Sequence, residues 1–221
     1  MNDTPTVHLY FVLDRSGSMD AIRDDVVGGF NSFVGQQAAE PGECLMTLVQ
    51  FDSQDPYEVL FDARPLLDVP PLTPGTFQPR GATPLYDAMG RSIADATIRA
   101  EQRAAAGEPD EEIVFVTFTD GLENASREYD RDKVFTAVKK REDRGWTFVF
   151  LGANQDSYAA GHALGYDPRS VQNFAATPDG TAAAFLSLDR STKSMRRRLA
   201  ARAPVDKGDF FEGRKEAEGH G

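Results

Sequence analysis

Two uninterrupted runs of β-forming residues, each followed at once by an aspartate, constrain the fold more than any other feature of the sequence. The first run is residues 7–13, followed by Asp14, and the second is residues 113–119, followed by Asp120. Neither run alternates between apolar and polar residues, which is typical of strands buried on both faces of a parallel sheet. Such sheets are covered by helices on both sides, so the sequence predicts an α/β fold.

The rest of the chain fits this prediction. Further strands are predicted over residues 44–51, 58–63 and 147–151, and helical spacing of apolar residues predicts helices over 20–40, from 84, over 134–141 and from 178. The turn at residues 52–56 is short enough for an antiparallel hairpin at the sheet edge. Six prolines make residues 65–84 a rigid, extended connection. We therefore expect a doubly wound, mostly parallel, Rossmann-like sheet flanked by helices, with one antiparallel edge strand.

A length of 221 residues predicts one domain, over residues 1–203. The polar tail, residues 204–221, is expected to be poorly ordered. The sequence leaves open whether the pair Phe210 and Phe211 docks on the domain. The single cysteine, Cys44, lies in an apolar run and is expected to be a buried core thiol. A chain with one cysteine can form neither an internal disulfide nor a thiolate zinc site.

The charge of the chain limits its partners. A net charge of −11 and a pI near 4.7 disfavour nucleic acid, which needs a basic surface. The basic residues between Arg190 and Arg198 are expected to form a solvated helix face. No run approaches the roughly 18 apolar residues that span a bilayer, and the polar start lacks the pattern of a signal peptide. We expect a cytoplasmic protein that binds neither nucleic acid nor membrane.

The two aspartates that end the buried strands point to a ligand site. Parallel strands end at one edge of the sheet, and ligands of such folds bind outside that edge. The loop Asp14-Arg15-Ser16-Gly17-Ser18 and the residues Asp120-Gly121 therefore bring carboxylates and hydroxyls to the same place. Two carboxylates crowded together need a cation between them, and a set of oxygen ligands selects a hard ion. Mg²⁺ is the expected metal, with Mn²⁺ or Ca²⁺ as substitutes.

Three short segments resemble one known site. The spacing Asp14-x-Ser16-x-Ser18, the threonine Thr83 before a helix, and Thr119-Asp120-Gly121 resemble the metal-ion-dependent adhesion site (MIDAS) of von Willebrand factor A domains, in their stand-alone bacterial and phage form. The resemblance extends over roughly residues 6–200. It implies that Ser16, Ser18 and Thr83 bind the ion directly, that Asp14 and Asp120 bind it directly or through water, and that one coordination position stays open for a partner.

Other interpretations remain for several of these residues. Thr83 precedes Pro84, which suits the first position of a helix, so Thr83 is equally well explained as the helix N-cap. Asn124 and residues 154–156 follow strand ends and are candidates for the rim of the site. His8 lies inside a strand and His162 lies beside glycines, so both are interpreted as structural.

The resemblance implies a metal-dependent protein-binding, adaptor-like module, not an enzyme, that captures an Asp or Glu carboxylate of another protein. One alternative is a metal-dependent phosphohydrolase of the haloacid-dehalogenase-like type, which also has an aspartate after its first strand. Those enzymes need a second aspartate two residues later, where this chain has Ser16. The other alternative is a structural subunit with a vestigial site, which a metal-binding measurement would distinguish from the module.

Overall fold

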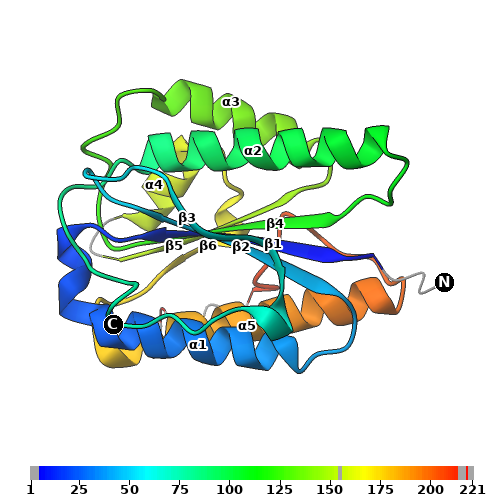
Figure 1. Ribbon diagram of the computed structural model, residues 1–221, viewed down its shortest axis with the longest axis horizontal. Helices are drawn as coiled ribbons and strands as arrows, with labels where there is room; N and C mark the ends of the chain where they lie inside the picture. The colour runs from blue at the N-terminus through cyan, green and yellow to red at the C-terminus, as the bar shows by residue number, and fades with distance from the viewer. Residues whose placement is uncertain (1–4, 154–155, 214–217, 219–221) are drawn as a thin grey trace.

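A computed structural model describes residues 5–153, 156–213 and 218, and it confirms the predicted α/β fold. Its described residues form a six-stranded sheet in the order β3-β2-β1-β4-β5-β6 (Figure 1). All neighbouring strands are parallel except β2 and β3. The strands are β1 (Val7–Asp14), β2 (Cys44–Phe51), β3 (Glu58–Pro65), β4 (Glu112–Thr119), β5 (Thr147–Gly152) and β6 (Val171–Asn173).

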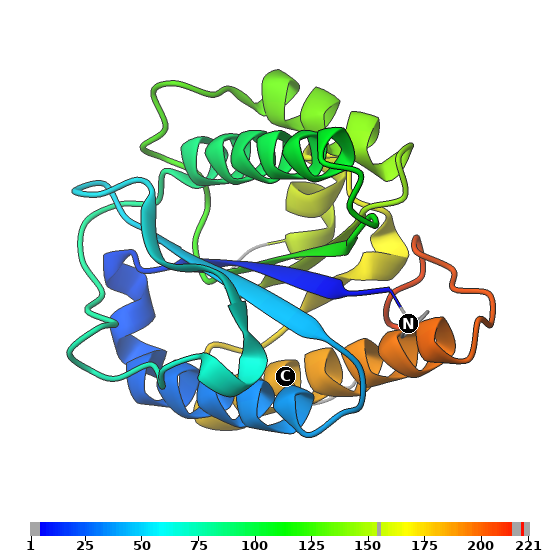
Figure 2. The same ribbon diagram turned by 45° about the vertical axis from the view of Figure 1, so that its right-hand side comes forward.

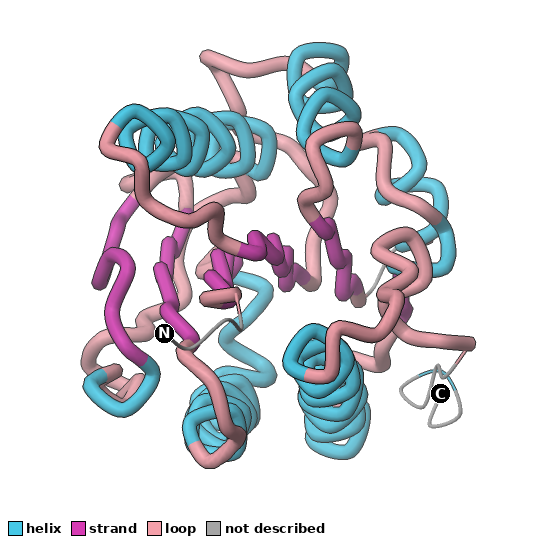
Figure 3. Tube along the Cα trace, turned by 90° about the vertical axis from the view of Figure 1, so that its right-hand side faces the viewer, coloured by secondary structure: helices cyan, strands magenta, loops and turns pink. Residues whose placement is uncertain are grey.

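Helices cover both faces of the sheet (Figures 1 and 3). One face carries α2 (Leu85–Ala105), α3 (Arg131–Glu142) and α4 (Ser157–Ala163), and the other carries α1 (Arg23–Ala38) and α5 (Pro178–Ala200). Short 3-10 turns span Gly17–Ile22, Leu66–Asp68 and Pro168–Ser170. Among the described residues, no helix combines the length and the apolar character needed to cross a membrane.

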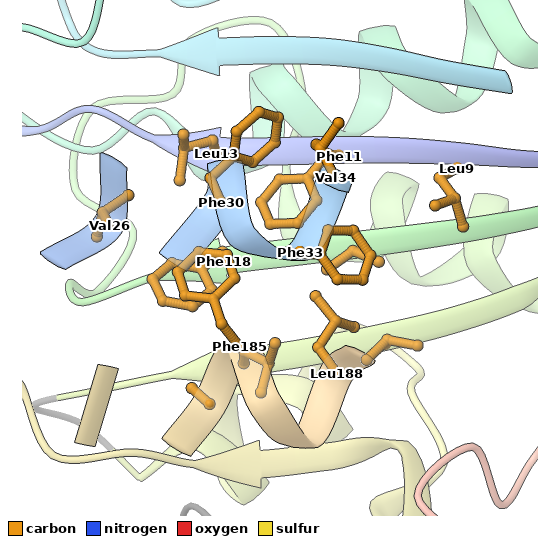
Figure 4. Close-up of a cluster of buried hydrophobic side chains, with 14 of the residues drawn as sticks. Leu9, Phe11, Leu13, Val26, Phe30, Phe33, Val34, Phe118, Phe185 and Leu188 are labelled. Carbon is orange, nitrogen blue, oxygen red and sulfur yellow. The ribbon is translucent and has the colours of Figure 1, made fainter. Parts of the chain in front are cut away.

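Aromatic rings fill the space between the sheet and the α1/α5 layer (Figure 4). The ring of Phe185 on α5 stacks on Phe118 of β4, with centroids 4.9 Å apart. A Cβ atom at Gly29 of α1 would lie 2.2 Å from the Phe185 ring, so only glycine lets the two helices approach this closely. This packing holds α1 and α5 close together over β4.

The antiparallel edge strand β3 is irregular. Its register against β2 shifts twice, between Met46 and Leu48 and between Leu48 and Val49. Ala63 lies in the left-handed region, with φ 44°, and the strand ends in Pro65. The strand ends at Pro65, two residues beyond the predicted end at residue 63.

Two of the smaller elements were not predicted. The helix α4 consists largely of small residues, and β6 is only three residues long, so neither gives a periodic signal. The first helix also begins later than expected, at Arg23, because a 3-10 turn precedes it. Asp20 lies within that turn and therefore does not cap the helix.

The expectation of a solvated basic face on α5 is wrong for one residue. Arg196 is buried, and its guanidinium donates to the backbone carbonyls of Gln37 and of Glu40, Pro41 and Gly42. These carbonyls follow the end of α1, where the helix leaves acceptors without partners. Arg196 therefore ties α5 to α1.

The chain after α5 turns back towards the sheet (Figure 2). Phe210 and Phe211 are buried in the α1/α5 core, so the aromatic pair docks. The hydroxyl of Ser170 donates to the carbonyl of Gly208 at 2.8 Å, and Lys207 donates to the carbonyl of Gly145 at 2.6 Å. Residues 214–217 and 219–221 of the predicted tail lie outside the described residues.

Candidate metal centre

The predicted site lies where the direction of strand order reverses. β1 pairs with β2 on one side and with β4 on the other, so successive connections leave β1 and β4 in opposite directions. In doubly wound sheets, ligands bind at this switch point, outside the carboxyl ends of the strands. Asp14 is the last residue of β1, and Asp120 directly follows β4.

Asp14 is fully buried and held from two sides. Its Oδ1 accepts the backbone N–H of Ser16 at 2.7 Å, and its Oδ2 accepts the hydroxyl of Thr119 at 2.6 Å. Thr119, for which the motif implied no role, thus orients the carboxylate. A hydroxyl at the last position of a buried strand, directly before the aspartate of the site, is the signal that could have identified it.

The two serines connect Asp14's loop to Asp120. The Ser18 hydroxyl donates to Asp120 Oδ1 at 2.6 Å, and the Oγ atoms of Ser16 and Ser18 lie 3.1 Å apart. Ser16 and Asp120 are both almost inaccessible to solvent. Side chains more than 100 positions apart in the sequence therefore form one polar cluster.

Gly121 shows how Thr83 joins this cluster. A Cβ atom at Gly121 would lie 3.2 Å from Thr83 Oγ1, 3.6 Å from Ser18 Oγ and 4.0 Å from Asp14 Oδ2. Oxygens from three separate segments thus surround one small space that the missing side chain leaves open. The N-cap of α2 is Pro84, and among the described residues the Thr83 hydroxyl accepts no N–H of the first turn, so the interpretation of Thr83 as the cap is wrong.

The electrostatics of the cluster favour a cation. Burial raises the pKa of Asp14 to about 7, although hydrogen bonds from Thr119 and Ser16 oppose the shift, and the charge of Asp120 adds to it. Burial also raises the pKa of Asp120. Neither carboxylate forms an ion pair with a lysine or arginine in the described part of the chain. Two buried carboxylates without counter-charge are costly unless a cation neutralises them.

The donor types decide which cation fits. No three His, Cys, Asp or Glu side chains gather as a metal site among the described residues, so the hydroxyls are needed to complete any set here. Carboxylate and hydroxyl oxygens suit a hard divalent ion that keeps some water ligands. The donor types therefore fit a divalent cation, and Asp14, Ser16, Ser18, Thr83 and Asp120 are the residues that could hold it.

Solved structures resemble the chain over most of its length. A von Willebrand factor type A protein from Catenulispora acidiphila is 16% identical, with a TM-score of 0.54 over 89% of this chain and 43% of its own. The chain has the von Willebrand factor type A fold.

Two other structures that resemble this von Willebrand A fold contain metals. The proximal thread matrix protein 1 of the mussel byssus, with a zinc-occupied MIDAS motif, is 14% identical, with a TM-score of 0.59 over 86% of this chain and 46% of its own. The manganese-loaded TRAP protein of Plasmodium vivax is 14% identical, with a TM-score of 0.53 over 81% and 71%. The chain spans less than half of the Catenulispora and mussel proteins. Its sequence matches no family model and no curated protein.

Within this von Willebrand A fold, a buried ion pair holds two of the site's loops together. Asp52, which follows β2, accepts Arg15 Nε at 2.8 Å and Arg80 Nε at 2.9 Å through one oxygen. Backbone bonds run alongside, from Arg80 N–H to the Arg15 carbonyl at 2.9 Å and from Gly17 N–H to the Gly81 carbonyl at 3.1 Å. The loop that carries the serines is thereby fixed against the loop that leads to Thr83.

A second clamp joins Thr83 to the Asp120 loop. The Thr83 N–H donates to Asn124 Oδ1 at 2.8 Å, and the Asn124 N–H donates to the Thr83 carbonyl at 3.1 Å. Glu123 accepts the N–H of Tyr86 at 2.9 Å, which satisfies a free donor in the first turn of α2. Asn124, expected at the rim, thus has a positioning role. Asp156 caps α4, while Asn154 and Gln155 lie outside the described residues.

Proposed function

We propose that this chain is a metal-dependent protein-binding module that captures a carboxylate of another protein through a divalent cation. The observation that carries the proposal is the convergence of two buried, uncompensated carboxylates and three hydroxyls at the switch point of the sheet. The von Willebrand A fold and the metal-containing structures similar to it support the same function. Mg²⁺ is the ion we propose, with Mn²⁺ or Ca²⁺ as substitutes.

The ligand set explains why an acidic partner would bind. Asp14 and Asp120 supply two negative charges, whereas Ser16, Ser18 and Thr83 supply neutral oxygens. A divalent cation bound there accepts a further carboxylate, because the protein ligands do not leave an excess of negative charge around it. The attraction acts locally and offsets a net charge of −11, which would otherwise repel an acidic ligand.

We further propose that the chain is not an enzyme. An aspartyl phosphatase requires a carboxylic acid two residues after its nucleophile, and Ser16 stands at that position next to Ser18. Turnover of a phosphate ester by the wild-type protein with Mg²⁺ that disappears in Asp14→Asn would favour the phosphohydrolase alternative instead.

Titration calorimetry with Mg²⁺ and Mn²⁺ tests the metal, and affinity capture from cell extract with and without Mg²⁺ tests the partner. We expect one ion per chain, and a partner retained by wild type and lost in Asp14→Ala or after chelation. Asp132→Ala is the matched control, since Asp132 is an exposed acid on α3. Failure to bind either metal would leave the structural-subunit alternative.

A change of Thr83 separates metal binding from partner capture. Thr83→Asp adds a third carboxylate, so it should tighten metal binding while weakening capture, because the ion is then more nearly neutralised. The two affinities should move in opposite directions. Unchanged partner affinity with the metal still bound would mean that the partner does not contact the ion.

A further inference from the structure

A cavity of about 550 Å³ lies next to the candidate metal centre. Ala82 and Pro84, the neighbours of Thr83, form part of its wall, and so does Asn124, which holds Thr83 by two hydrogen bonds. The cavity thus adjoins the segment that carries Thr83. The remaining lining residues are Ser53, Pro56, Asp87, Ala125, Ser126 and Arg127.

The acid in this wall is already satisfied. The carboxylate of Asp87 accepts the backbone N–H groups of Arg127, Glu128 and Tyr129 at 2.8 to 2.9 Å. Burial would raise the pKa of Asp87, but the hydrogen bonds from these three N–H groups outweigh it and lower the pKa. Asp87 is thus committed to holding the loop against α2, and it is not free to pair with a side chain in the cavity.

The nearby acids on the same loop are also engaged. Glu123 accepts the N–H groups of Tyr86, Ala125 and Ser126, and Glu128 forms an ion pair with Arg91. Arg127 differs from them: its side chain is exposed and has no ion pair or hydrogen bond among the described residues. The wall of the cavity therefore includes an arginine without an ion-pair partner among the described residues, together with Ser53, Asn124 and Ser126.

We infer that this cavity receives a second acidic side chain of the same partner, with Arg127 as its counter-charge. The partner is then an acidic segment with one carboxylate for the metal and another, a few residues away, for Arg127. The inference rests on the proposed function. It deepens that function by giving the site a preference for paired acids over a single acid.

The expected size of the preference follows from the exposure of Arg127. Ion pairs at exposed sites contribute modestly, so the second acid should strengthen binding about two- to fivefold. The gain should shrink as salt is raised, because exposed charges are screened. Metal affinity should be unaffected by changes at Arg127, since its side chain takes no part in the ligand set.

Synthetic peptides test the inference without a known partner. Each carries one Asp and, one, two or three positions later, either Glu or Gln, all other residues being Gly. NMR titration of the Mg²⁺-loaded protein, which measures millimolar affinities, should show that at least one Glu peptide binds better than its Gln twin. The difference should vanish in Arg127→Gln and persist in Arg144→Gln, a control at an exposed arginine between α3 and β5.

The outcomes separate the inference from the function it depends on. Binding of Asp peptides that requires Mg²⁺, with equal affinities for Glu and Gln twins at every spacing, overturns the inference and leaves the proposed function standing. A Glu preference that survives in Arg127→Gln also overturns it. Absence of any Mg²⁺-dependent peptide binding counts against the proposed function itself.

Discussion

Asp14 is a buried carboxylate whose partners are the neutral donors Ser16 and Thr119. Without a cation, and above its raised pKa of about 7, Asp14 must carry its charge away from water and next to Asp120. Asp14→Asn removes that charge and keeps the shape of the side chain. We expect the variant to melt roughly 2 to 8 °C higher than wild type in chelator, which corresponds to 1 to 2 kcal/mol in a chain of this size.

The same substitution should abolish the stabilisation that Mg²⁺ gives to wild type, because a ligand that binds only the folded state raises its stability. Thermal melts of both proteins, with chelator and with Mg²⁺, check the two effects together. An Mg²⁺-dependent rise in the melting temperature of Asp14→Asn would place the metal elsewhere in the molecule.

Gly121 offers a test that leaves every proposed ligand in place. Its backbone is not in the left-handed region, so alanine is allowed there, but the new Cβ would lie 3.2 Å from Thr83 Oγ1 in the space enclosed by the ligands. We expect Gly121→Ala to weaken Mg²⁺ binding roughly 10- to 100-fold, as changes around metal ligands do. Titration calorimetry with Mg²⁺ measures this change in affinity.

The matched control for that variant is Gly28→Ala. Gly28 lies on α1, and a Cβ atom there would meet nothing within 4 Å. It should keep wild-type metal affinity and gain about 0.5 to 1 kcal/mol of stability from its better helix propensity. Equal metal affinity in both alanine variants would show that the space beside Gly121 does not hold the ion.

At the scale of elements, the start of α2 is aligned by residues outside the helix. Asn124 is the acceptor that positions Thr83, and Asn124→Ala removes it. We expect a loss of about 1 kcal/mol in stability and a drop of roughly tenfold in metal affinity. Asn124→Asp, which keeps the acceptor oxygen, should recover most of the metal affinity. Equal metal binding by the two variants would argue against a positioning role.

The long elements could be predicted because β1 and β4 are buried on both faces and consist almost entirely of β-forming residues. Their terminal aspartates then had to meet at one edge. Thr83 could not be assigned from sequence, since a threonine before Pro84 has the same pattern whether or not it caps a helix. The start of α2 is instead held by tertiary contacts: Asn124 and Glu123, about 40 positions away, bind the backbone there. Such distant partners leave no local pattern.

At the scale of the molecule, a buried charged network lies at the amino-terminal ends of the central strands, at the opposite end of the strands from the metal centre. Glu111 accepts His8 Nδ1 at 3.0 Å and Arg99 Nη2 at 2.7 Å. Burial would raise the pKa of Glu111, but the hydrogen bonds from His8 and Arg99 outweigh it and lower the pKa to about 2. Burial lowers the pKa of His8, which therefore stays neutral at pH 7.

Both shifts make the unfolded chain bind protons more readily than the folded one, so acid destabilises the protein. The contribution of Glu111 is complete above its ordinary pKa of 4.5 and is lost as the pH falls towards about 2. Urea unfolding between pH 7 and pH 3 should show this loss in wild type. Glu111→Gln should be less stable at pH 7 and should lose less on acidification. Parallel pH profiles for the two proteins would contradict the assignment.

The docked aromatic pair makes the chain after α5 part of the whole molecule's stability. Phe211 is fully buried, so Phe211→Ala should cost about 3 to 5 kcal/mol of unfolding free energy. Phe135→Ala is the control, since Phe135 on α3 is 39% exposed and should cost far less. Denaturant unfolding of wild type and both variants measures these free energies. A loss below about 1 kcal/mol for Phe211→Ala would mean that the segment does not belong to the core.

The irregular strand β3 also determines how copies of this protein behave at high concentration. A flat, exposed edge strand pairs readily with its counterpart on another molecule and starts aggregation. Register shifts, the left-handed Ala63 and the terminal Pro65 break the row of donors and acceptors along β3, and its charged Glu58, Asp62 and Arg64 disfavour contact with another strand. At the opposite edge, β6 offers only three residues. Neither edge of the described sheet therefore favours strand pairing between copies of this protein, which disfavours polymerisation through the sheets.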